Sequence, residues 1–285
     1  MRQAHRWAVG CVGFLVGLGI VGGAGGAAAD NEGDKEQALP AVFQAAGPTA
    51  AAIQSTVDAF RAALGDPNNA NAPGPLATGR REINWDGGGN NDTTAPLPPA
   101  NPFDVFLDSR GARFTTPGTG LTQGPPDGGP QGGLAALFDN PTYGDIFSPF
   151  SPLRLFAPVG SNFVDGRFFI PGTNGAEPAA VKGFGAVFTD VDRPAGSLSG
   201  DHLRDLIPRT LITYFDADGQ ELFTGVVPAS PGDGSLSFFG VVFAKARVAR
   251  IRIISGSAAP GPDDDTQHDI VVMDDFLYGE PQPLD

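Results

Sequence analysis

Short apolar and aromatic runs bounded by Gly, Pro or Asp fill the part of the chain from Lys182 to Phe243. This is the pattern of half-buried β-strands joined by tight turns. Similar runs precede and follow, so we expect strands at Val164–Ile170, Ala180–Asp190, Leu211–Phe215, Glu221–Val227, Leu236–Phe243, Val248–Ile254 and Ile270–Tyr278. No helical pattern separates them, which excludes a parallel sheet with crossover helices. The sequence therefore predicts an all-β, antiparallel β-sandwich.

The run Val248–Ile254 shows the clearest alternation of polar and apolar residues. Arg250 and Arg252 are expected to face water, whereas Ile251 and Ile253 are expected to face the core. One side of this strand should therefore lie on the surface of the sandwich.

One short amphipathic helix is predicted near the N-terminus, at about residues 48–65. Its apolar positions fall on one helical face, at Ile53, Val57, Phe60 and Leu64. Pro48 suits the first helical position and Gly65 the position just past the end. The apolar face could dock a partner, but covering part of the sheet is the simpler interpretation.

Changes in composition divide the chain into segments. A linker rich in Pro, Asn, Gly and Ala, residues 66–78, follows the helix, and the apolar Ile83 and Trp85 then alternate with polar residues as in an opening strand. We therefore expect an N-terminal segment at 30–78, a β-sandwich domain at 79–280 and a tail at 281–285.

The first 29 residues have the form of a secretory signal peptide. Arg2 and Arg6 precede the uncharged run Trp7–Ile20, and Ala27–Ala29 offers a small-residue cleavage site. A single membrane anchor is the alternative, but four glycines dilute the run. The only cysteine, Cys11, lies within this segment, so a cleaved chain would have no disulfide. We expect a secreted, extracellular or periplasmic protein.

The chain is strongly acidic, with a formal net charge of −14, and removal of Arg2 and Arg6 would make it more so. Such a chain repels phosphate backbones and anionic lipid surfaces, so neither nucleic acid nor a membrane is an expected partner. Divalent cations would be attracted instead. The oligomeric state cannot be inferred from these features.

Several strand and turn motifs resemble those of a group of uncharacterised secreted bacterial proteins. They are Gly79–Gly87, Gly183–Asp192, Phe215–Gly219, the run beginning at Leu236, and Met273–Gly279. The resemblance implies a jelly-roll sandwich akin to carbohydrate-binding modules and galactose-binding-like domains. It also implies secretion and a binding activity rather than catalysis.

Catalytic residues are not indicated by any motif. A Ser/His/Asp triad needs a histidine base, and beyond the leader the chain has only His202 and His268, both in polar surroundings. Zinc sites prefer Cys or clustered His. A glycosidase with two paired acids remains open, because the sequence cannot pick two partners among 32 acidic residues. The sequence thus leaves enzymatic activity open and favours none.

The favoured function is that of a secreted, non-catalytic module that binds a ligand, such as a polysaccharide or cell-surface glycan. The alternatives are an extracellular carbohydrate-active hydrolase or lyase and a structural surface or matrix protein. Trp85 is the one tryptophan after the leader, and its alternation with polar neighbours favours a core position over a sugar-stacking one.

A structural Ca²⁺ ion is predicted at the last strand. Asp274 and Asp275 lie on opposite faces of a strand that is apolar on both sides, so at least one carboxylate needs a cation or several donors. Calcium prefers such oxygens. If the first and last strands run side by side, as the resemblance implies, then Glu82, Asn84 or Asp86 would lie close.

The acidic residues of the last strand and of the segment Asp216–Gly219 can also be explained without calcium. Asp274 and Asp275 could instead bond backbone amides at a β-bulge or sheet edge. The segment Asp216–Gly219 does not fit the spacing of an EF-hand and is better explained as a hairpin turn.

Overall fold

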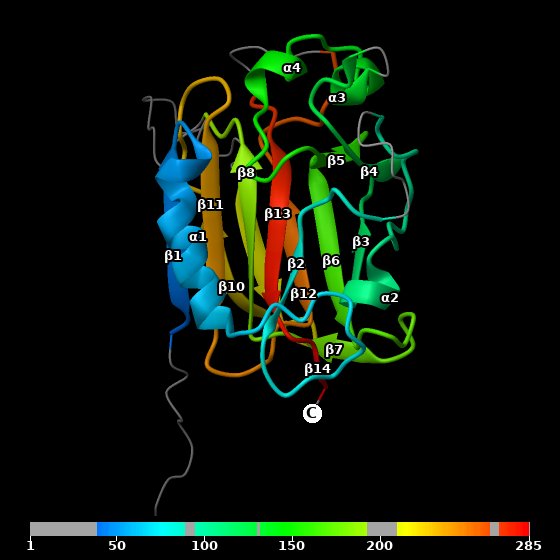
Figure 1. Cartoon of the computed structure of the whole chain (residues 1–285), viewed down its shortest axis with the longest axis vertical. Helices are drawn as coiled ribbons and strands as arrows, with labels where there is room; N and C mark the ends of the chain where they lie inside the picture. The colour runs from blue at the N-terminus through cyan, green and yellow to red at the C-terminus, as the bar shows by residue number, and fades with distance from the viewer. Residues whose placement is uncertain (1–38, 89–94, 130–131, 193–209, 263–267, 285) are drawn as a thin grey trace, which may run out of the picture. The chain divides into compact units, whose positions relative to one another are not determined.

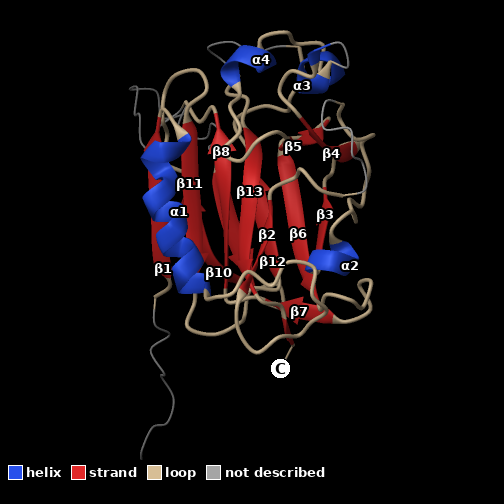
Figure 2. Cartoon of the chain, viewed as in Figure 1, coloured by secondary structure: helices blue, strands red, loops and turns tan. Residues whose placement is uncertain are grey.

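The computed structural model describes residues 39–88, 95–129, 132–192, 210–262 and 268–284. The described residues form two antiparallel sheets of seven strands each, with four helices (Figure 1, Figure 2). The predicted all-β, antiparallel architecture is confirmed. The signal peptide expected at residues 1–29 lies outside the described residues.

The first sheet, sheet A, has the strand order β1-β11-β8-β13-β5-β4, and β2 pairs with β13. Its strands are β1 (Ala41–Gly47), β2 (Arg80–Ile83), β4 (Gly120–Gly124), β5 (Leu155–Val159), β8 (Gly183–Thr189), β11 (Leu236–Val242) and β13 (Val272–Gly279). The last long strand of the chain therefore lies in the middle of this sheet.

The second sheet, sheet B, has the order β10-β9-β12-β6-β7-β14, and β3 pairs with β6. Its strands are β3 (Ala112–Thr115), β6 (Phe163–Phe169), β7 (Pro178–Ala180), β9 (Leu211–Phe215), β10 (Glu221–Val226), β12 (Arg250–Ile254) and β14 (Gln282–Pro283). Ile251 and Ile253 are fully buried, as their alternation with Arg250 and Arg252 predicts.

The main core joins the inner faces of the two sheets. It contains Phe184 and Phe276 of sheet A and Tyr214 of sheet B, all fully buried. At its centre the ring of Trp85 stacks on Phe156, with centroids 3.9 Å apart and planes 3° apart. Trp85 is thus a core residue, which is what its alternation with polar neighbours favours.

The outer face of sheet A is covered as well. Helix α1 (Ala50–Leu64) buries Ile53, Val57, Phe60 and Leu64 against β8, β11 and β13. A second layer, built by the loop that carries α3 (Gly133–Leu137) and α4 (Tyr143–Ile146), packs on β5 and the start of β13. Because both faces of the sheet are covered here, every residue of β8 and β13 is buried, including the charged Asp274 and Asp275.

The sandwich begins earlier in the chain than expected. The sequence predicts its start at Gly79, whereas β1 is an edge strand of sheet A and residues 38–285 form one compact unit. Helix α1 corresponds to the helix expected at 48–65 and ends at Gly65, whose φ of 101° suits glycine. A fourth short helix, α2 (Leu107–Arg110), precedes β3. None of the described helices is long and apolar enough to cross a membrane.

Candidate functional site

The outer face of sheet B differs from that of sheet A because its side chains stay partly exposed. Along β12 and β6, buried residues alternate with half-exposed or exposed ones. The outward residues of β9, Leu211 and Phe215, are also half-buried. Among the described residues, this is the sheet face that remains open to solvent, and we refer to it as the open face.

Strand pairing arranges the open face in three rows that run across the strands. The first row contains Arg113, Arg167, Arg250, Phe215 and Glu221. The second row contains Thr115, Asp165, Arg252, Thr213 and Thr224. The third row is apolar and contains Phe163, Ile254, Leu211 and Val226. The face therefore grades from cationic to apolar over a few residues of strand length.

We call Arg113, Arg167 and Arg250 the arginine row. Arg113 donates two hydrogen bonds to Asp104, at 2.7 and 2.8 Å, and these bonds raise its pKa. The guanidinium of Arg250 lies 3.9 Å from the centroid of the Phe215 ring, a cation–π contact. Both outer members of the row thus have a partner within the protein.

Arg167, the middle member of the arginine row, is exposed and has no hydrogen bond or ion pair with any described residue. It lies directly opposite Arg113 on one side and Arg250 on the other. Like charges directly opposite each other on neighbouring strands destabilise a sheet. The arrangement is therefore unfavourable in the protein alone.

A hollow of about 440 Å³ lies beside the arginine row on the same face. It is lined by Thr115, Thr116, Pro117, Phe163, Asp165 and Arg252. Arg252 donates two hydrogen bonds to Asp165, at 3.1 and 2.9 Å, which raise the pKa of Arg252. The hollow thus offers a fixed carboxylate, a hydroxyl and one side of a phenyl ring to a ligand.

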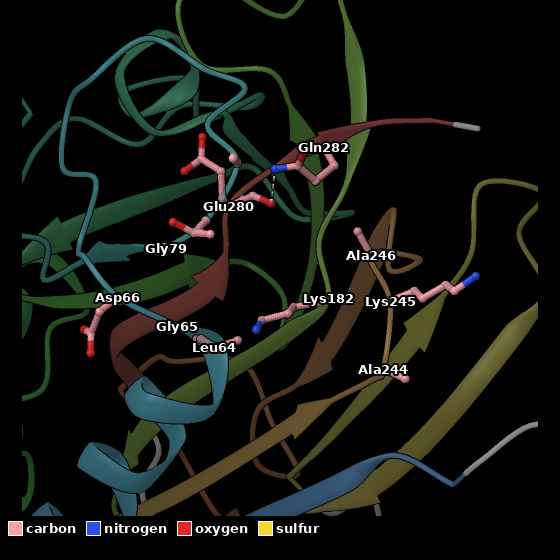
Figure 3. Close-up of a pocket in the computed structure, with 12 residues that line it drawn as sticks. Leu64, Gly65, Asp66, Gly79, Lys182, Ala244, Lys245, Ala246, Glu280 and Gln282 are labelled. Carbon is pink, nitrogen blue, oxygen red and sulfur yellow. Dashed lines mark hydrogen bonds between the residues drawn. The ribbon is translucent and has the colours of Figure 1, made fainter.

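A second pocket, of about 360 Å³, lies at the C-terminal end of α1 (Figure 3). In Figure 3 Lys182 points toward Leu64 and Gly65, and Lys245 points away. Burial lowers the pKa of Lys182. A cation at the C-terminal end of a helix is stabilised by the helix dipole, which accounts for Lys182 without a ligand. The carboxylate of Glu280 beside it is bound by Arg81.

The predicted metal ligands Glu82 and Asp275 do come together. Strand β2 pairs with β13, with Glu82 opposite Leu277, so the first strand of the expected domain and the last long strand run side by side. One nitrogen of Arg61, Nη2, lies 3.1 Å from Glu82 and 3.4 Å from Asp275. A guanidinium from α1 therefore supplies positive charge between these two carboxylates.

Asp274 and Asp86 bind backbone amides of one loop. Asp274 Oδ2 accepts hydrogen bonds from the amides of Phe150 and Ser151, at 2.6 and 3.1 Å. Asp86 Oδ1 accepts them from the amides of residues 153 and 154, at 2.6 and 3.0 Å. Asn84 is exposed and donates a hydrogen bond of 3.4 Å to Asp86, its one hydrogen-bond partner among the described residues. The pairing of β13 with β8 shifts register just after Asp274, which marks a β-bulge.

Burial is the largest influence on the titration of this aspartate pair. It raises the pKa of Asp274, the charge of Asp275 adds to the effect, and backbone amides oppose it. Burial also raises the pKa of Asp275, opposed by Ser151 and Arg61. Within the described ranges, no three His, Cys, Asp or Glu side chains are grouped so as to hold a metal ion. Calcium binding stays a prediction.

A Ser/His/Asp triad cannot be traced at either of the two histidines that the sequence offers as catalytic bases. His202 lies outside the described residues, and His268 is half-buried next to a segment that is also outside them. The arginine row was not anticipated from the sequence. Arg250 was expected to face water, but only the strand order reveals that Arg167 and Arg113 continue its row.

No family model matches the chain, and neither a curated protein nor a solved structure shows significant similarity to it.

Proposed function

We propose that this chain is a secreted, non-catalytic module of jelly-roll type that binds polysaccharide on the open face of sheet B. The observation that carries the proposal is the difference between the two sheets. Sheet A is covered by α1 and by the loop of α3 and α4, whereas sheet B leaves a row of half-exposed apolar side chains in solvent.

The chemistry of the open face suits a sugar chain. Phe163, which lines the hollow, offers ring surface for the apolar side of a pyranose, and Phe215 adds the part of its ring that Arg250 does not cover. Thr115, Asp165 and Arg252 offer donors and acceptors for hydroxyl groups around the hollow. A sheet is also a rigid support, so the ligand would meet preorganised side chains.

Secretion and the absence of catalysis are parts of the same proposal. The leader predicted at residues 1–29 would place the chain where extracellular polysaccharides occur. The described carboxylates on or beside the open face do not form a free pair, because Asp104 is held by Arg113, Asp165 is held by Arg252, and Glu221 belongs to a different row from Asp165. A held carboxylate of this kind orients a ligand rather than transferring a proton.

Binding to an array of acidic and neutral polysaccharides tests the proposal. Phe163→Ala and Phe215→Ala should each weaken binding at least about tenfold, which corresponds to about 1.4 kcal/mol. Val42→Ala, which removes an exposed apolar side chain from β1 of sheet A, is the matched control and should bind as the wild type does. Release of reducing ends would instead support the hydrolase or lyase alternative, and absence of both binding and turnover would support a structural protein.

A further inference from the structure

We infer that the ligand is an acidic polysaccharide and that the arginine row binds its carboxylates, an inference that rests on the proposed function. Arg113, Arg167 and Arg250 occupy neighbouring strands in direct register. Neighbouring strands lie about 4.8 Å apart. This spacing is comparable to the length of one sugar unit, so a uronate whose carboxylate meets Arg167 would have its neighbouring sugars over Arg113 and Arg250.

The central arginine is the strongest argument for an anionic ligand. Arg113 is held by Asp104, and Arg250 contacts the Phe215 ring and lies 3.4 Å from Asp165. Arg167 is flanked by both of these cations and has no anionic partner among the described residues. A carboxylate bound at Arg167 would relieve the like-charge repulsion that the row imposes on the free protein.

The geometry of the guanidinium favours carboxylate over other groups. Its planar fork binds a carboxylate through two parallel hydrogen bonds, which gives both strength and orientation. The row next to the arginines suits the rest of a uronate, since its side chains are polar and it lies about 7 Å along the strands. A sugar chain lying across the strands would then place its acids on the arginine row and its hydroxyl groups over Asp165 and Thr213.

The acidic character of the whole chain does not prevent such binding. Charges farther than about 8 Å are largely screened at physiological salt, so the local face determines the attraction. The net negative charge of the chain repels nucleic acid more strongly, because each nucleic-acid strand carries one charge about every 3.4 Å. A uronate polymer carries one charge per sugar and is repelled less.

A pair of ligands that differ mainly in charge gives the decisive test. The probes are polygalacturonate and its methyl ester, measured by isothermal titration calorimetry at low and high salt. The wild type should bind the acid form more tightly, and salt should weaken that binding. Arg167→Gln should weaken it roughly ten- to hundredfold. Lys245→Gln removes one exposed cation elsewhere and should bind as the wild type does.

Stability measurements separate a binding role for Arg167 from a structural one. In the absence of ligand, Arg167→Gln should leave the melting temperature unchanged or raise it, because the substitution removes a like-charge contact. A lower melting temperature together with unchanged binding would assign Arg167 a structural role and overturn the inference.

The remaining binding results distinguish failure of the acidic-ligand inference from failure of the proposed function. Equal binding of both forms, unaffected by Arg167→Gln, overturns the acidic ligand and leaves polysaccharide binding standing. Binding of neutral polysaccharides alone has the same meaning. Absence of binding to every polysaccharide on the array overturns the proposed function as well. Tighter binding of single-stranded oligothymidylate than of polygalacturonate would replace the polysaccharide with nucleic acid.

Discussion

Arg81 and Glu280 form a doubly hydrogen-bonded ion pair in the interior, with two contacts of 2.6 Å. The side chain of Arg81 is 0% exposed and that of Glu280 is 2% exposed. Arg81 also donates to the carbonyl oxygens of Ala70 and Ala72, and Glu280 accepts from Asn69. The pair therefore fastens the segment between α1 and β2 to the end of β13.

Glu280→Gln should lower the free energy of unfolding by about 3–5 kcal/mol, because it leaves a buried guanidinium without its counter-charge. Urea denaturation measures the loss. The double variant Arg81→Met/Glu280→Leu should lose less than the single variant, since it removes both charges. A single-variant loss below about 1 kcal/mol would contradict the importance of the pair.

Trp85→Ala should cost about 3–5 kcal/mol, because it empties the centre of an aromatic cluster that includes Phe156 and Phe276. Phe215→Ala is the control, as it removes a half-exposed ring and should change stability by about 1 kcal/mol or less. Chemical denaturation followed by circular dichroism compares the two. Similar losses would mean that Phe215 is as important to the core as Trp85.

The aspartate pair on β13 should give the protein an unusual pH response. Burial raises the pKa of Asp274 above the value of about 3.9 of an unfolded chain. Between these two pKa values the folded state binds the proton that the unfolded state has released, so the contribution to stability falls as pH rises. The stability advantage of wild type over Asp274→Asn should therefore be larger at pH 4 than at pH 7.

Urea denaturation at several pH values measures that difference. Asp218→Asn, on an exposed turn, controls for the loss of one carboxylate elsewhere. An advantage of wild type that grows with pH would show that the amide hydrogen bonds to Asp274 outweigh its burial.

Calcium binding is tested by thermal melts in EDTA and in millimolar Ca²⁺. An ion bound only by the folded state raises the melting temperature, and Asp274→Asn and Asp275→Asn should then remove the response. Arg61→Met should enlarge it, because the guanidinium between Glu82 and Asp275 would no longer compete with the ion. Coincident wild-type melts in the two solutions would contradict the calcium prediction.

Local sequence predicts those strands and helices whose conformation is set by their own residues and turns, with little dependence on tertiary contacts. The run Leu211–Phe215 is rich in apolar and aromatic residues and is followed by an Asp-Ala-Asp-Gly turn, so its observed bounds as β9 follow directly. Strand β1 is not predicted from the sequence because it has few large apolar residues. It lies at the edge of sheet A and is covered on one side by α1. Its conformation depends on β11 and the helix rather than on its own pattern.

The site residues show the same limit. The approach of Glu82 to Asp275 is predictable from the pairing of strands, but the entry of Arg61 between them depends on how α1 lies on the sheet. Likewise, Arg167 joins Arg113 and Arg250 only through the strand order of sheet B. Such contacts between distant segments are set by tertiary packing, which no local pattern encodes.

The central place of β13 has a consequence for the biogenesis of the protein. Residues 272–279 pair with β8, β5 and β2, so sheet A cannot close until residue 279 has left the ribosome. Contacts of such long sequence separation form slowly. A core that stays open until β13 emerges leaves the chain unfolded for longer, which is the state that export would require if the leader predicted at residues 1–29 acts as one.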